Sequence, residues 1–151
     1  MSEVLSPAYE VTWEGQGEFL STRVRRALSV DEANEYSRVL DMAIARLLPG
    51  TGFVWLSNSS GYEPLANRGG HAVYRSILPK VLAEHGLRTS LLDMYEGEVL
   101  IEHSFEVTCR AVAHVHHDAD KMAIFDGRFG RANERYFSDE DLARDWLLKF
   151  L

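Results

Sequence analysis

The chain has 151 residues, of which 46% are hydrophobic and 26% charged, and its formal net charge is −7. This length and composition fit one globular domain, residues 1–151, and exclude a chain that is disordered throughout. The negative charge disfavours nucleic acid as a partner, and no apolar run reaches the ~20 residues of a membrane span.

Two segments of alternating apolar and polar residues open the chain. Residues 9–13 and 19–28 flank a glycine-containing turn, which predicts a β-hairpin. Ser29 and Glu32 have the spacing of a capping box, and the apolar residues after them recur at steps of three and four. We therefore expect a helix that runs from Ser29 to the stop signal at Pro49-Gly50.

The middle of the chain predicts two buried strands with a helix between them. Residues 52–56 and 89–95 are short apolar runs of the buried-strand type. Residues 71–85 indicate a helix with a kink or break at Pro79. The polar loop 57–70 joins the first strand to this helix.

Segment 104–117 fits two periods, because its apolar residues alternate as in a strand and also form a helical stripe. Strands at 121–125 and 134–137 and a helix that opens at Ser138 follow. Strands that alternate with helices predict an α/β (or α+β) fold. Its central mixed β-sheet has about five to six strands, including an N-terminal β-hairpin, and three to four helices cover the sheet.

The C-terminal part of the chain resembles a known family over residues 89–147. Three stretches carry the resemblance: LLDMYEG (91–97), AHVHH followed by KMAIF (113–117 and 121–125), and RYFSDEDLARDWL (135–147). They are similar to a strand end, a helix-to-strand step and the closing helix of STAS-like domains related to the sporulation anti-sigma-factor antagonist. The resemblance favours a helix at 104–117. It implies a small module without enzymatic activity that docks a protein partner or holds an acyl-like ligand.

Two features depart from the family pattern. The family places a helix between its last two strands, and only residues 126–133 remain for it here. Regulatory members carry an Asp-Ser-(Ser/Thr)-Gly step whose hydroxyl is phosphorylated at a helix N-terminus. This chain has Asn58-Ser59-Ser60-Gly61 after a strand, but the next helix is expected about ten residues later.

The candidate binding residues lie in or next to the polar loop. Ser59 and Ser60 are candidates for a phosphate that a partner controls, and a simple turn is the alternative. Tyr62, a large aromatic residue in a polar loop, and Arg68 are expected to contact a ligand or partner.

A second cluster of polar residues combines imidazole and carboxylate groups. His114, His117 and Asp118 are the candidates for a zinc or nickel site, and a polar helix end is the alternative. Their spacing matches no named metal motif. We expect no cofactor.

Three functions remain open at this point. The first is the STAS-like binding or regulatory module. The second is a hot-dog-like acyl-thioester hydrolase, which requires an antiparallel meander over residues 98–137, with Asn58, His71 or Glu84 near the thioester. The third is an acidic antitoxin or immunity-type protein that blocks a basic partner, because opposite charges speed association. We expect the first, in the cytoplasm, with a homodimer left open.

Overall fold

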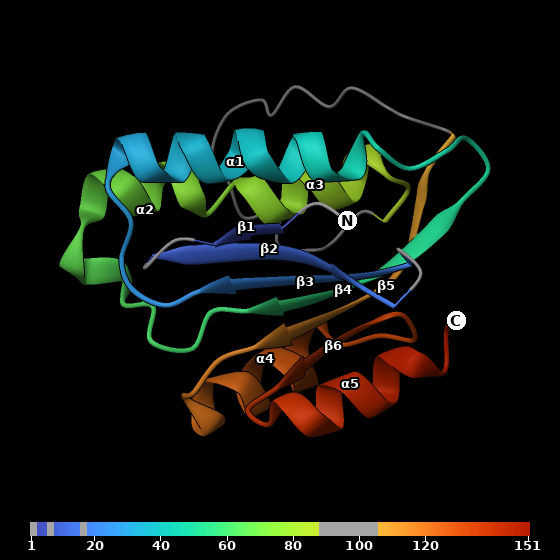
Figure 1. Ribbon diagram of the computed structural model, residues 1–151. Coiled ribbons are helices and arrows are strands. Elements are labelled where there is room, and N and C mark those ends of the chain that lie inside the picture. The colour runs from blue at the N-terminus through green and yellow to red at the C-terminus, as the bar shows by residue number, and fades with distance from the viewer. Residues whose placement is uncertain (1–2, 6–7, 16–17, 88–105) are drawn as a thin grey trace.

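Six strands form one sheet, which α-helices cover (Figure 1). The computed structural model describes residues 3–5, 8–15, 18–87 and 106–151. The strands are β1 Glu3–Leu5, β2 Tyr9–Glu14, β3 Phe19–Val24, β4 Gly52–Asn58, β5 Thr108–Val115 and β6 Glu134–Phe137. The helices are α1 Val30–Ile44, α2 Arg68–Tyr74, α3 Ile77–Glu84, α4 Ala119–Phe129 and α5 Glu140–Leu148, with a 3-10 helix at Pro64–Ala66. The strand expected at 89–95 and the motif at 91–97 lie outside the described residues.

The sheet is antiparallel at its start and parallel from β3 onward. Its order follows the chain, β1-β2-β3-β4-β5-β6. The pairs β1–β2 and β2–β3 are antiparallel, whereas β3–β4, β4–β5 and β5–β6 are parallel. Each parallel step needs a crossover connection, which α1, then α2 with α3, and then α4 supply. The α/β fold class, the mixed sheet and the N-terminal hairpin are confirmed.

Helix α1 begins where the sequence predicts it. The Ser29 side chain accepts from the Glu32 backbone N–H at 3.1 Å, and the Glu32 carboxylate accepts from the Ser29 N–H at 3.0 Å. The helix ends at Ile44, before the expected stop, and a turn covers the remaining residues. Its buried stripe is made of Ala33, Tyr36, Leu40, Ala43 and Ile44.

Alternation along the strands divides the interior into two cores on opposite faces of the sheet. Residues such as Phe53 and Trp55 of β4 pack in the first core with α1 and α3. Their neighbours Val54 and Leu56 pack in the second core with α5. Because both faces are covered, β4 is buried along its whole length.

The expected break in the helix after the polar loop is confirmed, but it lies before Pro79 rather than at it. Helix α2 ends at Tyr74, and α3 begins at Ile77. Proline lacks an N–H, and its ring clashes with the carbonyl four residues earlier, here that of Arg75. The distortion therefore falls one turn before the proline.

Two expectations for the C-terminal half are wrong. Segment 104–117 contains strand β5 instead of a helix, and residues 121–125 lie inside α4 instead of forming a strand. The Asp118 carboxylate caps α4 by accepting from the Lys121 N–H at 3.0 Å, so the helix starts immediately after β5. Helix α4 is thus the helix that the family places between its last two strands, and the first departure noted above disappears.

The expectation of an antiparallel meander over residues 98–137, which a hot-dog hydrolase requires, is also wrong for the described residues 106–137. Strand β5 runs parallel to both β4 and β6, and α4 connects it to β6. Parallel neighbours joined by a helix cannot form an antiparallel meander.

The close approach of α2 to the α1 cap yields a stability prediction. A Cβ at Gly70 would lie 1.6 Å from the backbone oxygen of Leu28, whereas a Cβ at Gly69 would meet its nearest neighbour at 3.4 Å. We expect Gly70→Ala to lower the free energy of unfolding by about 3 kcal/mol, because the backbone must move. The matched control Gly69→Ala should be neutral, or stabilising by up to about 1 kcal/mol through helix propensity. Urea denaturation measures both, and equal effects of the two substitutions would contradict this packing.

Candidate functional site

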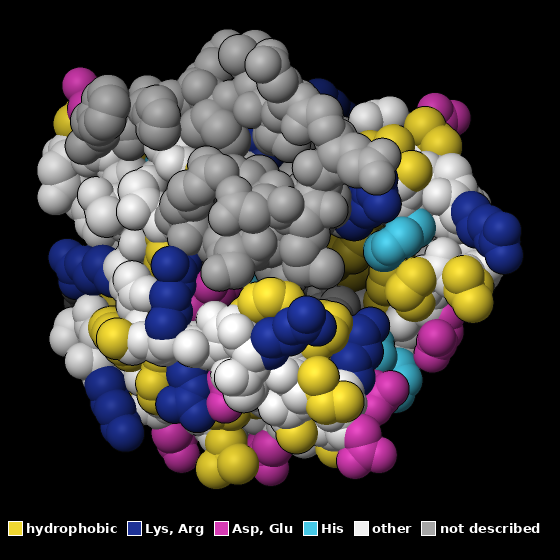
Figure 2. All heavy atoms as spheres, turned by 180° about the vertical axis from the view of Figure 1, so that it is seen from behind, with side chains coloured by type: hydrophobic (Ala, Val, Ile, Leu, Met, Phe, Trp, Pro, Cys, Tyr) yellow, Lys and Arg dark blue, Asp and Glu magenta, His cyan; other side chains and the backbone are white. Residues whose placement is uncertain are grey.

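A pocket of about 390 Å³ lies at the carboxyl ends of β4 and β5. Its lining comes from the segment after β4, from α2 and α3 on one side, and from α4 and β6 on the other. The carboxyl edge of parallel strands is where open α/β sheets bind ligands. Seen from behind, histidine, basic and hydrophobic side chains lie close together on this face of the molecule (Figure 2).

Aromatic rings form the wall on the α2 side. The centroids of the Tyr62 and Tyr74 rings are 4.6 Å apart, and that of His71 lies 5.8 Å from Tyr62. Tyr62 is buried although it lies within the polar loop 57–70. The prediction that Tyr62 belongs to a site is therefore consistent with its place in the pocket wall.

A second aromatic wall lies on the α4 and β6 side. The His114 ring stacks on Tyr136 with centroids 4.2 Å apart and an interplanar angle of 8°. Phe125 of α4 meets Tyr136 edge to face at 5.8 Å. On the other face of β6, Phe137 contacts Trp146 of α5, so α4 and α5 flank this strand.

Tyr62 and His71 form a neutral hydrogen-bonded pair. The Tyr62 hydroxyl and His71 Nδ1 are 2.8 Å apart. Burial raises the pKa of Tyr62 to about 12. Burial, together with the nearby charges of Arg75 and Lys121, lowers the pKa of His71. At neutral pH the hydroxyl therefore donates to Nδ1, and the imidazole proton sits on Nε2.

A buried carboxylate orients the second pocket histidine. Glu134 has no exposed surface, and its Oε2 lies 2.8 Å from His114 Nε2. Arg131 Nε lies 3.3 Å from Glu134 Oε1. Because an ionised carboxylate only accepts hydrogen bonds, it fixes the proton of His114 on Nε2.

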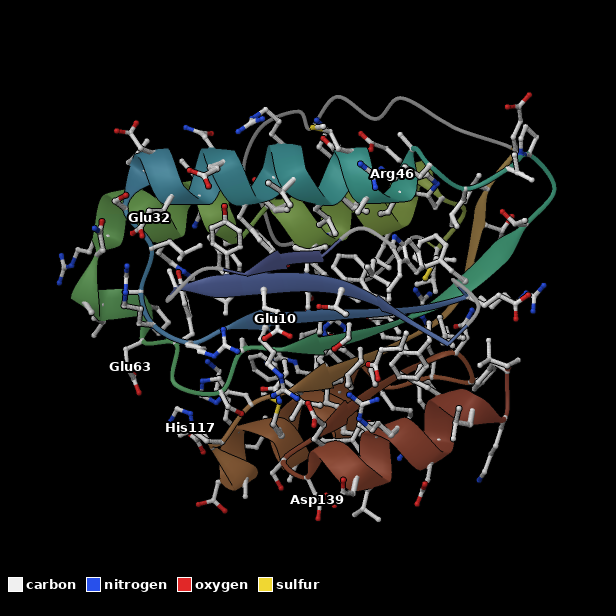
Figure 3. All side chains as sticks on the ribbon, viewed as in Figure 1. Glu10, Glu32, Arg46, Glu63, His117 and Asp139 are labelled. Atoms are coloured by element: carbon white, nitrogen blue, oxygen red, sulfur yellow. The ribbon has the colours of Figure 1, made fainter. Side chains whose placement is uncertain are left out.

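Two further histidines, His116 and His117, lie between β5 and α4 and form hydrogen bonds with the loop after β4. His116 Nε2 lies 3.1 Å from the Tyr62 carbonyl oxygen, and the Gly61 N–H donates to His117 Nδ1 at 3.0 Å. His117 Nε2 also lies 3.5 Å from Glu63, at the same end of the molecule (Figure 3). These contacts hold the loop that carries Tyr62 against the pocket.

The predicted binding residues fall in different environments. Ser59 lines the pocket, and its hydroxyl lies 3.3 Å from the Val115 carbonyl oxygen. The Ser60 N–H donates to Asn58 Oδ1, as in an Asx turn. Arg68 is exposed at the start of α2 and does not line the pocket. Neither serine lies at a helix N-terminus, because α2 begins only at Arg68.

The three metal candidates have separate roles. His114 pairs with Glu134, His117 contacts the loop, and Asp118 caps α4. Within the described residues no group of three or more His, Cys, Asp or Glu side chains is placed to hold a metal ion.

Sequence reasoning missed most of the site. Glu134, Tyr136 and Lys121 come from β6 and α4, and no short motif joins them, whereas His71 was named only for the hydrolase alternative. The one available signal was the alternation of His114 and His116, which would have placed both on one face of a strand.

The fold and the pocket define an α/β domain with a SpoIIAA-like fold. The structure is similar to that of an uncharacterized protein from the DUF3478 family with a SpoIIAA-like fold from Shewanella loihica PV-4. The match covers 97% of this chain and 98% of the other, with a TM-score of 0.52 and 15% sequence identity. The expected resemblance to the sporulation anti-sigma-factor antagonist is thus confirmed for the fold. No family model and no curated protein matches the sequence.

No helix in the described part of the chain has both the length and the apolar character needed to cross a membrane.

The buried His114–Glu134 pair predicts a measurable coupling. We expect His114→Ala to lower the free energy of unfolding by about 3 kcal/mol, because it removes a partner from a fully buried carboxylate. In the background of Glu134→Gln the same substitution should cost at least about 1 kcal/mol less. Urea denaturation of the two single variants and the double variant measures this difference.

The control is Glu63→Gln, at an exposed histidine contact, which should change the free energy of unfolding by no more than about 0.5 kcal/mol. Additive costs at His114 and Glu134 would show that the pair is not coupled.

Proposed function

We propose that this chain is a binding and regulatory module without enzymatic activity, which holds a small acyl-like ligand in the pocket between α2–α3 and α4. The observation that carries the proposal is the pocket itself, a preformed space of about 390 Å³ at the carboxyl edge of the parallel strands. Small-molecule sites have this size, this position and this kind of aromatic lining.

The arrangement of the pocket's polar groups supports binding over catalysis. His71 bonds to Tyr62, and His114 bonds to Glu134. His116 uses both ring nitrogens, because its Nδ1 accepts from the Asp118 N–H at 3.0 Å while Nε2 faces the Tyr62 carbonyl. Cys109 lies in the first core, where burial raises the pKa of its thiol. A buried thiol with a raised pKa is a poor nucleophile.

The SpoIIAA-like fold supports a regulatory role, in which an occupied and an empty pocket present different surfaces to a protein partner. Ligand binding would act on the Tyr62 loop and on α4, since both line the pocket and the loop is bonded to His117, two residues before α4. A cytoplasmic location and a single-domain chain remain predictions from the sequence. Phosphorylation of Ser59 or Ser60 also remains a prediction from the sequence.

Filling the pocket tests the proposal. Leu78 of α3 lines the pocket and is half-buried, so Leu78→Trp should occupy part of the ligand space. We expect one bound equivalent of hexanamide or hexanoate in calorimetric titration of the natural chain. Leu78→Trp should weaken binding at least about tenfold.

The matched control is Leu142→Trp, at a position on α5 that is 59% exposed. It should leave the affinity unchanged. Failure of every short-chain probe at millimolar concentration, or binding that survives in Leu78→Trp, would overturn the proposed function.

A further inference from the structure

The charge of the pocket is opposite to that of the chain. The sequence has 23 acidic and 16 basic residues. The described lining residues nevertheless include Arg75, Lys121 and three histidines, and none of them is an aspartate or glutamate. Glu134 lies beside the pocket, where it pairs with Arg131 and bonds to His114. Among the described lining residues the permanent charges are therefore those of Arg75 and Lys121, which favour an anionic ligand.

Lys121 is placed to meet a ligand. It stands in the first turn of α4, with its Nζ 5.6 Å from the centroid of Phe125 in the second aromatic wall. No carboxylate among the described residues forms an ion pair with it. Arg75 lines the same pocket from the end of α2. Both cations also act on the His71 side chain in the pocket. Burial is the larger cause of the lowered pKa of His71, and the charges of Arg75 and Lys121 lower this pKa further.

The pocket also contains a hydroxyl group that a ligand can reach. The Ser57 side chain is only 7% exposed and lines the pocket from β4, next to His114 in the strand register. Within the described part of the chain its hydroxyl has no hydrogen-bond partner. Because Ser57 lines the pocket, its hydroxyl can donate a hydrogen bond to an oxygen of a ligand.

We propose that the pocket takes a small organic acid, with its carboxylate facing Lys121 and Arg75 and its flat aromatic or short acyl body between the two aromatic walls. This inference rests on the proposed function and adds the charge of the ligand. The Ser57 hydroxyl donates to an oxygen acceptor of the ligand. Recognition of a carboxylate by cations at a half-enclosed site is strong because the hydrogen bonds are charge-assisted.

Probes of similar size and different charge test the proposal. Calorimetric titration compares benzoate, benzamide and benzylammonium, with hexanoate and hexanamide as the acyl pair. We expect each acid to bind about tenfold more tightly than its amide, benzylammonium to bind most weakly, and the advantage of the acids to shrink at high salt.

Variants separate the charge from the rest of the pocket. Lys121→Met keeps the apolar stem and should weaken benzoate about fivefold while leaving benzamide unchanged. Arg75→Met is a second variant with the same expected pattern, and Lys149→Met, at an exposed lysine after α5, is the control that should change neither. Ser57→Ala should weaken acid and amide alike, because both offer a carbonyl oxygen.

The outcomes distinguish the two proposals. If amides bind as tightly as acids, or if benzylammonium binds most tightly, the pocket is a ligand site but the inference of an acid is wrong. If neither acids nor amides bind, the proposed function fails together with the inference. Equal losses for benzoate and benzamide in both Lys121→Met and Arg75→Met would likewise overturn the role of the cations.

Discussion

The architecture depends on a one-residue irregularity in the pairing of β4 with β5. Phe53 pairs with Cys109 and Val54 with Ala111, so Arg110 is an extra residue in β5. A single inserted residue reverses which face every later side chain occupies. Cys109 consequently packs in the first core, while Ala111 packs in the second.

This bulge determines the lining of the pocket. Beyond it, alanines and Val115 turn toward α5, and the alternate positions His114 and His116 turn toward α2, α3 and α4. The parallel pairing then sets His114 beside Ser57 of β4 and Tyr136 of β6. The strand register thus brings together one buried carboxylate, several imidazoles and two aromatic walls. Each of the three parallel strands contributes one or two of these side chains.

Local signals in the sequence succeeded where one element carries its own information. The hairpin and the capping box at Ser29 depend on neighbouring residues, and both are present as expected. Segment 104–117 failed for a physical reason. Strand β5 is buried on both faces, so its apolar residues do not follow one period, and the bulge at Arg110 interrupts the alternation that remains. An error at β5 also hides the start of α4 at Asp118. The sequence named Ser59, Tyr62, His71 and His114 of the pocket lining, but for separate functions.

The sequence by itself determined the order of β2, β3, α1 and β4 and the fold class, because periodicity, caps and turn residues act over a few positions. Only the tertiary structure decided the parallel register of β4, β5 and β6, the pairing of His114 with Glu134 and the two cationic side chains of the pocket lining. These features join residues that are far apart in the chain, and a net charge of −7 gives no hint that Arg75 and Lys121 line the same pocket. Their spatial arrangement follows from the packing of helices against a covered sheet, which no single segment encodes.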